Sequence, residues 1–437
     1  MSLNSSKIKI YYEQTSRLVN LLIVSGPLGM GGFAFILATF GVNFFSFITH
    51  MLLSRMLGPA NFGLLNVILG ISLLVTIPLT GIQMATTQSV IQQKINKTLY
   101  SAQIAAKRSF YFGLLIMVLL IASTPLVDSY VHVNSATTLV ALAAWVPVAA
   151  LGAFAQGVLL GNYQFRVAAF AIFIGTGVLR LVMSLLAVDA GFGVLGAMVA
   201  MFVAQTVSSL IMLILIRDSL LDNTNSNILH LKFKTTILST ASLLGLTALI
   251  SVDTFFARHI FDPRTAGFYV TGEVGAHMVL YLTSAFASIM FPLVSSGKGN
   301  DESSERIFLQ TVIVTGFCGI AASAVMTLFP KLIILIVFGS KFYGVSRILG
   351  ILSIASAVFA ILYLFTYLHI ARNSLFALLP WLGVAATLLF MKFMVLTITS
   401  LSILVLSISV ITTMISSIPI IYNFLGNHAK LDAVNEF

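Results

Sequence analysis

Residues 401–424 read LSILVLSISVITTMISSIPIIYNF and contain no charged side chain. A helix needs about 20 consecutive apolar residues to cross the roughly 30 Å of hydrocarbon in a bilayer, and this run is long enough. Lipid offers the backbone no hydrogen-bond partner, so a spanning segment must be a helix or part of a closed barrel. The run lacks the alternation of a barrel strand. It therefore predicts a membrane-spanning helix.

The rest of the chain has the same character. Hydrophobic residues make up 59% of the 437 residues and charged residues only 8%, whereas soluble domains carry about 25% charged residues. Such a chain could not cover a surface that faces water. The single cysteine, Cys318, excludes an internal disulfide. The composition therefore predicts an all-α integral membrane protein.

Apolar runs between polar breaks predict about twelve spans. Lys and Arg are roughly twice as frequent in the loops on the side of the termini, which places both termini in the cytoplasm. The net charge of +10 is then mostly a topological signal and not a nucleic-acid surface. The predicted spans are 33–53, 62–85, 110–127, 137–160, 167–188, 192–216, 235–257, 267–294, 307–329, 345–369, 375–397 and 401–424.

The chain divides into two halves of six spans each. Residues 58–63, GPANFG, resemble residues 262–267, DPRTAG, at an offset of 204 positions. An even number of spans per half gives both halves the same orientation, as in a parallel repeat. The predicted domains are a cytoplasmic N-terminus with an interfacial helix (1–32), a six-helix lobe (33–216), a cytoplasmic linker (217–234), a second six-helix lobe (235–424) and a cytoplasmic tail (425–437).

Polar residues follow one face of the first two spans of each half, where they are costly unless they line a cavity or join helices. Asn43 and His50 belong to the stripe in the first span, and Gln83 to the stripe in the second. Glu273 and His277 continue through Tyr281 at four-residue spacing in the eighth span. We expect these helices to line one cavity between the lobes.

Ionisable residues inside the spans are the strongest candidates for function. Asp253 and Glu273 lie near the outer ends of neighbouring spans, with His277 one turn deeper, so they could couple a proton or sodium ion. A structural pair with Arg258 is the alternative. Arg180 lies inside the fifth span, where a cation must face a cavity or an anion.

Guanidinium groups near the outer loops suit a phosphate-bearing substrate. Arg55, Arg258 and Arg264 add positive charge there, and an arginine fork binds phosphate through two hydrogen bonds. A pyrophosphate-bearing molecule would fit such a site. A solvated loop charge is the alternative for Arg55 and Arg264. No phosphate-binding glycine loop, zinc-spaced cluster or nucleophile elbow is found, so we predict no enzyme and no cofactor beyond the coupling ion.

Residues 53–63, LSRMLGPANFG, resemble the end of the first span in Wzx-type oligosaccharide flippases, the polysaccharide transporters of the MOP (multidrug/oligosaccharidyl-lipid/polysaccharide) superfamily. Asp253 followed by Asp262-Pro263 and the Ala266-Gly267-Phe268-Tyr269 run is similar to the same family, as is Phe338-Gly339. The resemblance implies a V-shaped fold of two pseudo-symmetric six-helix lobes, like that of MATE transporters.

The resemblance also implies a function. Family members move a polyprenyl-pyrophosphate oligosaccharide from the inner to the outer leaflet of the cytoplasmic membrane for surface polysaccharide synthesis. Arg180, Arg55 and Arg258 would then hold phosphate, and the polar stripes would contact sugar. The implied partners are this lipid-linked oligosaccharide, membrane lipids and the polysaccharide polymerase machinery.

Two other functions fit the sequence less well. A multidrug exporter of the same superfamily would need buried acids, which the first half lacks within its spans, and Arg180 would repel a cationic drug. A membrane glycosyl polymerase or ligase would need a large outer loop. No predicted outer loop exceeds about 20 residues, which is short for such a role.

Overall fold

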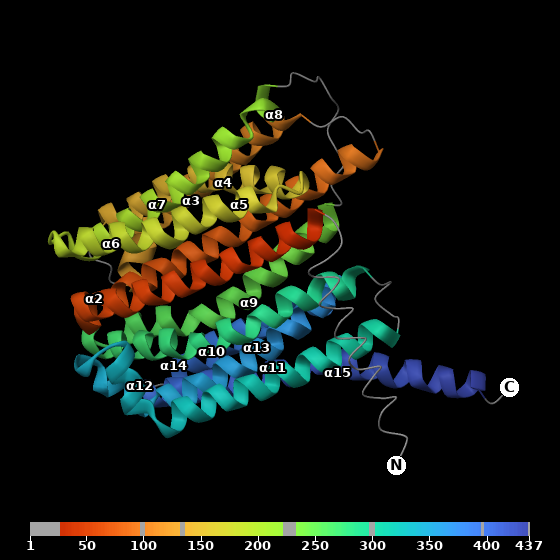
Figure 1. Cartoon of the computed structure of the whole chain (residues 1–437). Coiled ribbons are helices and arrows are strands. Elements are labelled where there is room, and N and C mark those ends of the chain that lie inside the picture. Colours follow the sequence, from red (N-terminus) through yellow and green to blue (C-terminus); the bar gives the residue numbers. More distant parts are fainter. Residues whose placement is uncertain are drawn as a thin grey trace, which may run out of the picture. The chain divides into compact units, whose positions relative to one another are not determined.

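The computed structural model describes residues 27–96, 101–131, 136–221, 233–296, 302–394 and 397–435, and these residues form helices joined by short connections (Figure 1). The predicted interfacial helix falls mostly on residues 1–26, outside the described residues. The first half contains α2 (Pro27–Asn96), α3 (Ala102–Val131), α4 (Ala136–Gly161), α5 (Phe165–Ile172), the π-helix η1 (Phe173–Leu179), α6 (Arg180–Asp189), α7 (Gly193–Leu215) and α8 (Arg217–Leu221).

The second half begins with α9 (Phe233–Ile260) and ends with α15. Its further elements are α10 (Pro263–Ser296), α11 (Glu302–Leu328), α12 (Pro330–Val337), the 3-10 helix η2 (Ser340–Arg347), α13 (Leu349–Ala371), the 3-10 helix η3 (Leu375–Leu378), α14 (Pro380–Met394) and α15 (Ile398–Asn435).

Ten helical segments among the described residues are long and apolar enough to cross a bilayer. The first, Leu37–Ile91, has 55 residues, more than twice the length of one crossing. Within it Gly58 adopts φ 71° and ψ 175°, so the helical path breaks there and Pro59 starts the next helix. The predicted first and second spans are therefore the two parts of α2, and the all-helical membrane fold is confirmed.

Two differences from the predicted spans have local causes. Helix α2 begins at Pro27, earlier than the predicted start at residue 33, because proline fits the first turn of a helix. The fifth span is not one regular helix, because its middle turns are π-helical at η1. Such wide turns occur often at functional sites.

The described residues group into two compact units. Unit 1 comprises residues of Met1–His50, Ile82–Ala122 and Val140–Leu231, and unit 2 comprises residues of Met51–Gly81, Ser123–Leu139 and Lys232–Phe437. Unit 2 thus holds the turn at Gly58 together with the whole second half of the sequence. The units differ from the predicted lobes, whose boundaries stay a prediction.

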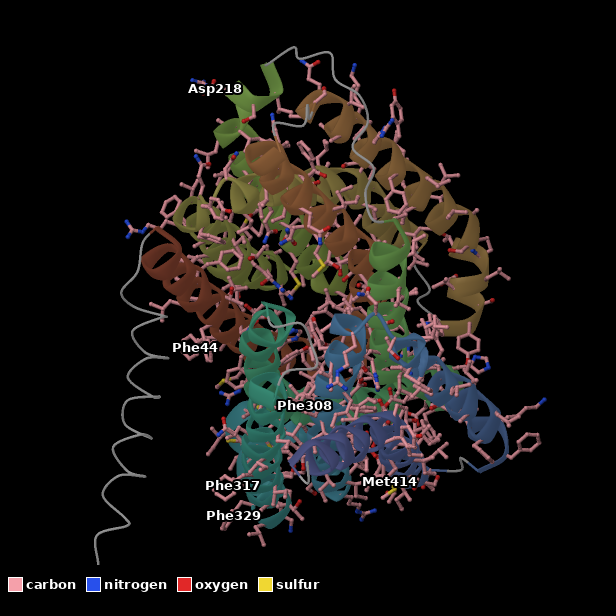
Figure 2. All side chains as sticks on the ribbon, turned by 90° about the vertical axis from the view of Figure 1, so that its right-hand side faces the viewer. Phe44, Asp218, Phe308, Phe317, Phe329 and Met414 are labelled. Atoms are coloured by element: carbon pink, nitrogen blue, oxygen red, sulfur yellow. The ribbon has the colours of Figure 1, made fainter. Side chains whose placement is uncertain are left out.

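Each unit has its own apolar interior. In unit 1, Phe154 and Leu159 of α4 pack with Met212 of α7 in one buried cluster. In unit 2, α13 lies against α10, α11 and α15. Large apolar side chains also point outward, including Phe317, Phe329 and Met414 (Figure 2). Outward apolar side chains on spanning helices are suited to lipid.

Candidate functional site

Four side chains meet inside unit 2, at the facing sides of α9 and α10. The Tyr269 hydroxyl donates a hydrogen bond of 2.6 Å to Oδ2 of Asp253. Nε2 of His277 lies 3.7 Å from Oε1 of Glu273, one helical turn away. Asp253, Tyr269 and Glu273 are all buried. We call Asp253, Tyr269, Glu273 and His277 the acidic cluster.

The acidic cluster brings two carboxyl groups together. Glu273 lies close enough to Asp253 for their charges to interact, and the second oxygen of Glu273, Oε2, is buried without a hydrogen-bond partner among the described residues. Two adjacent carboxylates removed from water repel each other, so the pair is stable only when a proton or a cation reduces the negative charge. This chemistry suits reversible cation binding.

The structure thus brings together all three residues of the predicted ion-coupling set. It also adds Tyr269, which the sequence reasoning missed. Tyr269 precedes Glu273 by four residues, so the stripe of Glu273, His277 and Tyr281 continues one turn toward the start of α10. Extending that periodicity could have found it.

Arg258 does not pair with the acidic cluster. Neither Asp253 nor Glu273 forms an ion pair with it in the described part of the chain. Its Nε donates to the carbonyl of Val131 at the end of α3, at 3.3 Å. The structural pair that was the alternative for the two acids is therefore not observed.

Arg55 also contacts the end of a helix. Its guanidinium donates from Nε to the carbonyl of Val337, at 3.4 Å, and from a terminal nitrogen to the carbonyl of Ile336. These are the last carbonyls of α12, and positive charge is favourable at a helix C-terminus. The geometry thus gives Arg55 a structural partner that the sequence did not reveal. Arg264 is exposed and lies over the ring of Phe268, 5.7 Å from its centroid.

In unit 1 the structure brings together Arg180 and His50. Nε of Arg180 and Nδ1 of His50 are both buried, and the two side chains are close enough to interact electrostatically. Asn43 is exposed and Gln83 is half-buried. Neither joins this pair by a hydrogen bond among the described residues.

The π-helix η1 ends directly before Arg180 and is held from two sides within unit 1. Ser208 of α7 donates to the carbonyl of Ala171, at 2.9 Å, and a Cβ on Gly175 would lie only 2.3 Å from that of Ser208. On the other side, the ring of Phe173 packs edge-on against Phe45 of α2, with centroids 5.6 Å apart. This packing fixes the helical position of Arg180.

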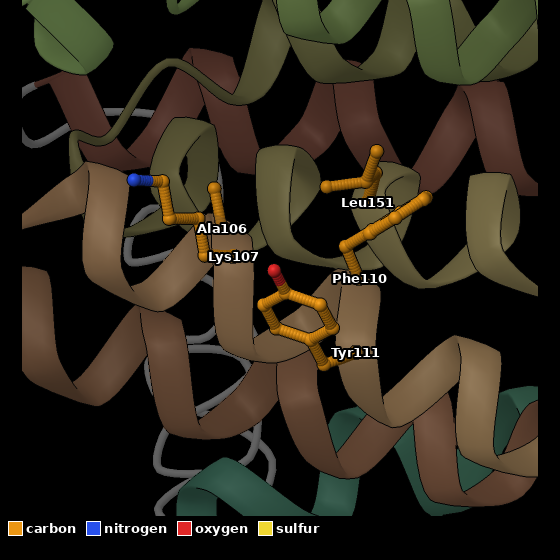
Figure 3. Close-up of a pocket in the computed structure, with 5 residues that line it drawn as sticks. All are labelled: Ala106, Lys107, Phe110, Tyr111 and Leu151. Carbon is orange, nitrogen blue, oxygen red and sulfur yellow. The ribbon is translucent and has the colours of Figure 1, made fainter.

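A shallow surface pocket of about 340 Å³ lies elsewhere in unit 1. It is lined by Ala106, Lys107, Phe110 and Tyr111 of α3 with Leu151 of α4, and Phe110 lies alongside Leu151 (Figure 3). It contains none of the predicted site residues, so it does not contribute to the candidate site.

The comparisons with known proteins agree with this architecture. A solved structure described as an inward-facing conformation of a multidrug resistance MATE family transporter of the MOP superfamily matches with a TM-score of 0.70 and 15% identity, covering 90% of this chain and 96% of that one. An outward-facing structure of a transporter described in the same way matches with a TM-score of 0.59 and 16% identity, covering 96% and 98%.

A third structure comes from Pyrococcus furiosus, and its description states that a binding pocket of reversed polarity suggests a different function for this MOP superfamily transporter. It matches with a TM-score of 0.63 and 16% identity, covering 95% of this chain and 98% of that one. At such identities the matches show the fold alone. No curated protein sequence matches this chain.

The family assignment comes from the sequence profile of the polysaccharide biosynthesis proteins, which matches residues 52–347. That range is more than half of the chain, and it includes the acidic cluster, Arg55 and Arg180. The solved structures that share this fold are described as transporters. The chain therefore belongs to the polysaccharide biosynthesis protein family, and its fold is similar to that of solved MOP superfamily transporters.

Proposed function

We propose that this chain flips a polyprenyl-pyrophosphate oligosaccharide from the inner to the outer leaflet of the cytoplasmic membrane, with both termini in the cytoplasm. A transporter in a polysaccharide biosynthesis family is expected to carry an intermediate of polysaccharide synthesis. A lipid-linked sugar is an intermediate of this kind, and it must cross the membrane. The headgroup would cross through the protein while the polyprenyl tail stays in lipid.

One observation supports this substrate above others: unit 1 holds a cation within a span, and its described carboxylates lie only near helix ends. In the described part of unit 1, the carboxylates Asp189 and Asp218 are exposed near helix ends, whereas Arg180 lies within a span. In unit 2, Asp253 and Glu273 are buried. A fixed interior cation attracts an anionic headgroup and repels a cationic one.

The proposed steps follow from the chemistry of these residues. The guanidinium of Arg180 would bind pyrophosphate oxygens through two parallel hydrogen bonds, with His50 beside it as a further donor. The neutral sugar hydroxyls would contact polar side chains such as Asn43 and Gln83. Binding by a charge inside a span replaces part of the hydration that the pyrophosphate loses.

The acidic cluster would couple transport to a cation gradient. Asp253 and Glu273 would bind one proton or sodium ion on the outer side, and release it on the inner side when the helices around them move. Tyr269 would hold Asp253 in place through its hydrogen bond. Coupling requires that the bound and free forms of this cluster favour different states of the transporter.

A multidrug exporter is the second candidate, and the buried carboxyl groups of Asp253 and Glu273 favour it, since acids bind organic cations. The two functions make opposite use of Arg180. A flippase needs this cation for its substrate, whereas an exporter of cations would transport equally well or better without it.

The test is a flipping assay in liposomes. Purified protein is reconstituted with a polyprenyl-pyrophosphate oligosaccharide, and exposure of the sugar to an enzyme added outside is measured under proton and sodium gradients. We expect protein-dependent exposure that Arg180→Ala abolishes and Arg166→Ala, an exposed arginine of α5, leaves intact. Export of a cationic dye without any exposure of the sugar would instead establish the exporter.

A further inference from the structure

The two copies of the repeated motif touch each other. A Cβ atom on Gly63 would lie 2.7 Å from Cα of Gly267, and a Cβ on Gly267 would lie 2.1 Å from the carbonyl oxygen of Pro59. Only glycine permits so close an approach. Gly63 and Gly267 are separated by the repeat offset of 204 residues. A position that contacts its own repeat equivalent lies at the axis that relates the two halves.

Two polar contacts flank this axis, and they are also related by the repeat. Arg55 donates to the last carbonyls of α12, as described above. His259 lies 204 residues after Arg55, and its Nδ1 is 2.8 Å from the carbonyl oxygen of Tyr130 at the end of α3. Since a carbonyl only accepts, Nδ1 carries the proton. Arg258 adds the bond to Val131. We call the Arg55 contact and the Arg258–His259 contact the two clasps.

Each clasp joins the two halves of the sequence within unit 2. The end of the first span holds the end of α12, the short helix that follows the ninth span. The end of the seventh span holds the end of the third. With both termini in the cytoplasm, all four ends fall on the outer side. The arginine contacts are charge-assisted bonds to helix C-termini, and Arg55 and His259 are exposed. Water can replace such bonds, so these contacts are suited to repeated opening.

An aromatic contact lies next to the clasps. Phe62, of the first motif copy, is fully buried, with its ring centroid 6.3 Å from those of Phe338 and Phe342. Phe62 belongs to the first half of the sequence, and its two partners belong to the second. The rings therefore seal the seam beside Gly63 against water.

We propose that the Gly63–Gly267 seam, the two clasps and the Phe62 contact form the outer gate of the transporter. The gate is closed in the structure described here and separates when the substrate is released outside. This inference rests on the proposed function only in that transport requires an outer opening. It does not depend on the substrate.

The first test fixes the gate shut. The rings of Tyr130 and His259 stack with their centroids 4.1 Å apart. In a Cys318→Ser background, Tyr130→Cys and His259→Cys place two thiols at these positions, and a short bifunctional thiol reagent then bridges them. We expect sugar exposure to fall to the level of empty liposomes and to recover on reduction. The control pair, Gly319→Cys with Ala357→Cys, joins α11 to α13 within the second half. Bridging it should leave transport unchanged. Full transport by the protein bridged at 130 and 259 would overturn the proposal.

The second test opens the gate and uses no lipid-linked sugar. Ala266 is 1% exposed, so Ala266→Cys in the Cys318→Ser background should react slowly with a membrane-impermeant maleimide added outside. Adding Gly63→Val should raise the labelling rate several-fold, and Gly63→Ala should raise it less. Gly316→Val is the control, because a Cβ there meets nothing within 4 Å. Equal labelling with and without Gly63→Val would disprove the gate. If Gly63→Val raises the labelling rate but the flipping assay fails, the gate stands and only the proposed substrate is disproved.

Discussion

The hydroxyl group of Tyr269 lies 2.6 Å from Oδ2 of Asp253, and both side chains are buried between α9 and α10. Because the phenol is the donor, the bond orients a carboxyl group that has lost its hydration. It also leaves Glu273, one turn further along α10, as the second carboxyl group in the same interior. The bond therefore sets which oxygens of the acidic cluster remain available for a cation.

Tyr269→Phe should separate stability from coupling. Removing the hydroxyl leaves Asp253 without its side-chain donor, and we expect the free energy of unfolding to fall by about 1–3 kcal/mol. The gradient dependence of sugar exposure should weaken as well. Thermal unfolding in detergent and the liposome assay measure the two effects. Tyr343→Phe, at an exposed tyrosine of η2, is the control and should change neither.

Glu273→Gln should remove coupling without removing the fold. The amide keeps the size of the side chain but does not exchange a proton at neutral pH and binds cations weakly. We expect transport that no longer responds to a proton or sodium gradient, while exchange of substrate without a gradient continues. Asp189→Asn, at an exposed acid at the end of α6, should keep the full response. An unaltered gradient response in Glu273→Gln would remove Glu273 from the coupling site.

Arg180→Lys should weaken substrate binding although it conserves the charge. Lysine is a point charge and lacks the planar fork that binds two phosphate oxygens together. We expect affinity for a polyprenyl-pyrophosphate analogue to fall roughly tenfold, which corresponds to about 1.4 kcal/mol. Titration of the purified protein with the analogue measures this. Wild-type affinity in Arg180→Lys would mean that only charge, and not geometry, matters at this position.

Asp262 should make the stability of α10 sensitive to acid. Its carboxylate accepts from the backbone N–H groups of Arg264 and Thr265, both at 3.1 Å, and so caps the helix. Hydrogen bonds from Thr265 hold the pKa of this carboxyl group below its ordinary range. A lowered pKa in the folded state stabilises the fold above the unfolded value of about 4, and this contribution is lost as the pH falls through the folded value.

The Asp262 contribution can be isolated by comparing variants. Asp262→Ala should lower the free energy of unfolding by about 1 kcal/mol at neutral pH, and it should remove part of the loss of stability on acidification. Asp262→Asn keeps a capping oxygen but not the charge, so it should retain most of the stability and lose the pH dependence. Melting curves in detergent at neutral and acid pH distinguish these cases. Because the group is largely exposed, screening by solvent keeps the effect small.

The sequence predicted the helices and the ionisable interior because both depend on local composition. Apolar runs between polar breaks locate the spans without any tertiary information, and a carboxyl group inside a run stands out. Asp253, Glu273 and His277 were found in this way. Tyr269 was not, because tyrosine is common in spans and stands out only when the four-residue spacing of Glu273 and His277 is extended by one turn.

The remaining differences depend on contacts between distant residues. Nothing near Arg55 in the sequence indicates the carbonyls of α12, which lie about 280 positions away. The π-helical turns before Arg180 likewise depend on Ser208 of another helix, which donates to the carbonyl of Ala171. Such features need the packed structure, because the same local sequence would be compatible with a regular helix.

The contact between Gly63 and Gly267 also has a consequence for the symmetry of the chain. In a symmetric dimer, the surface patch at the axis meets an identical patch on the other subunit. Two half-length chains, each carrying one copy of the motif, would meet through the same glycine. At this contact the single chain thus has the geometry expected at the axis of a homodimer. The two copies differ beside it, since Arg55 stands on one side of the axis and His259 on the other.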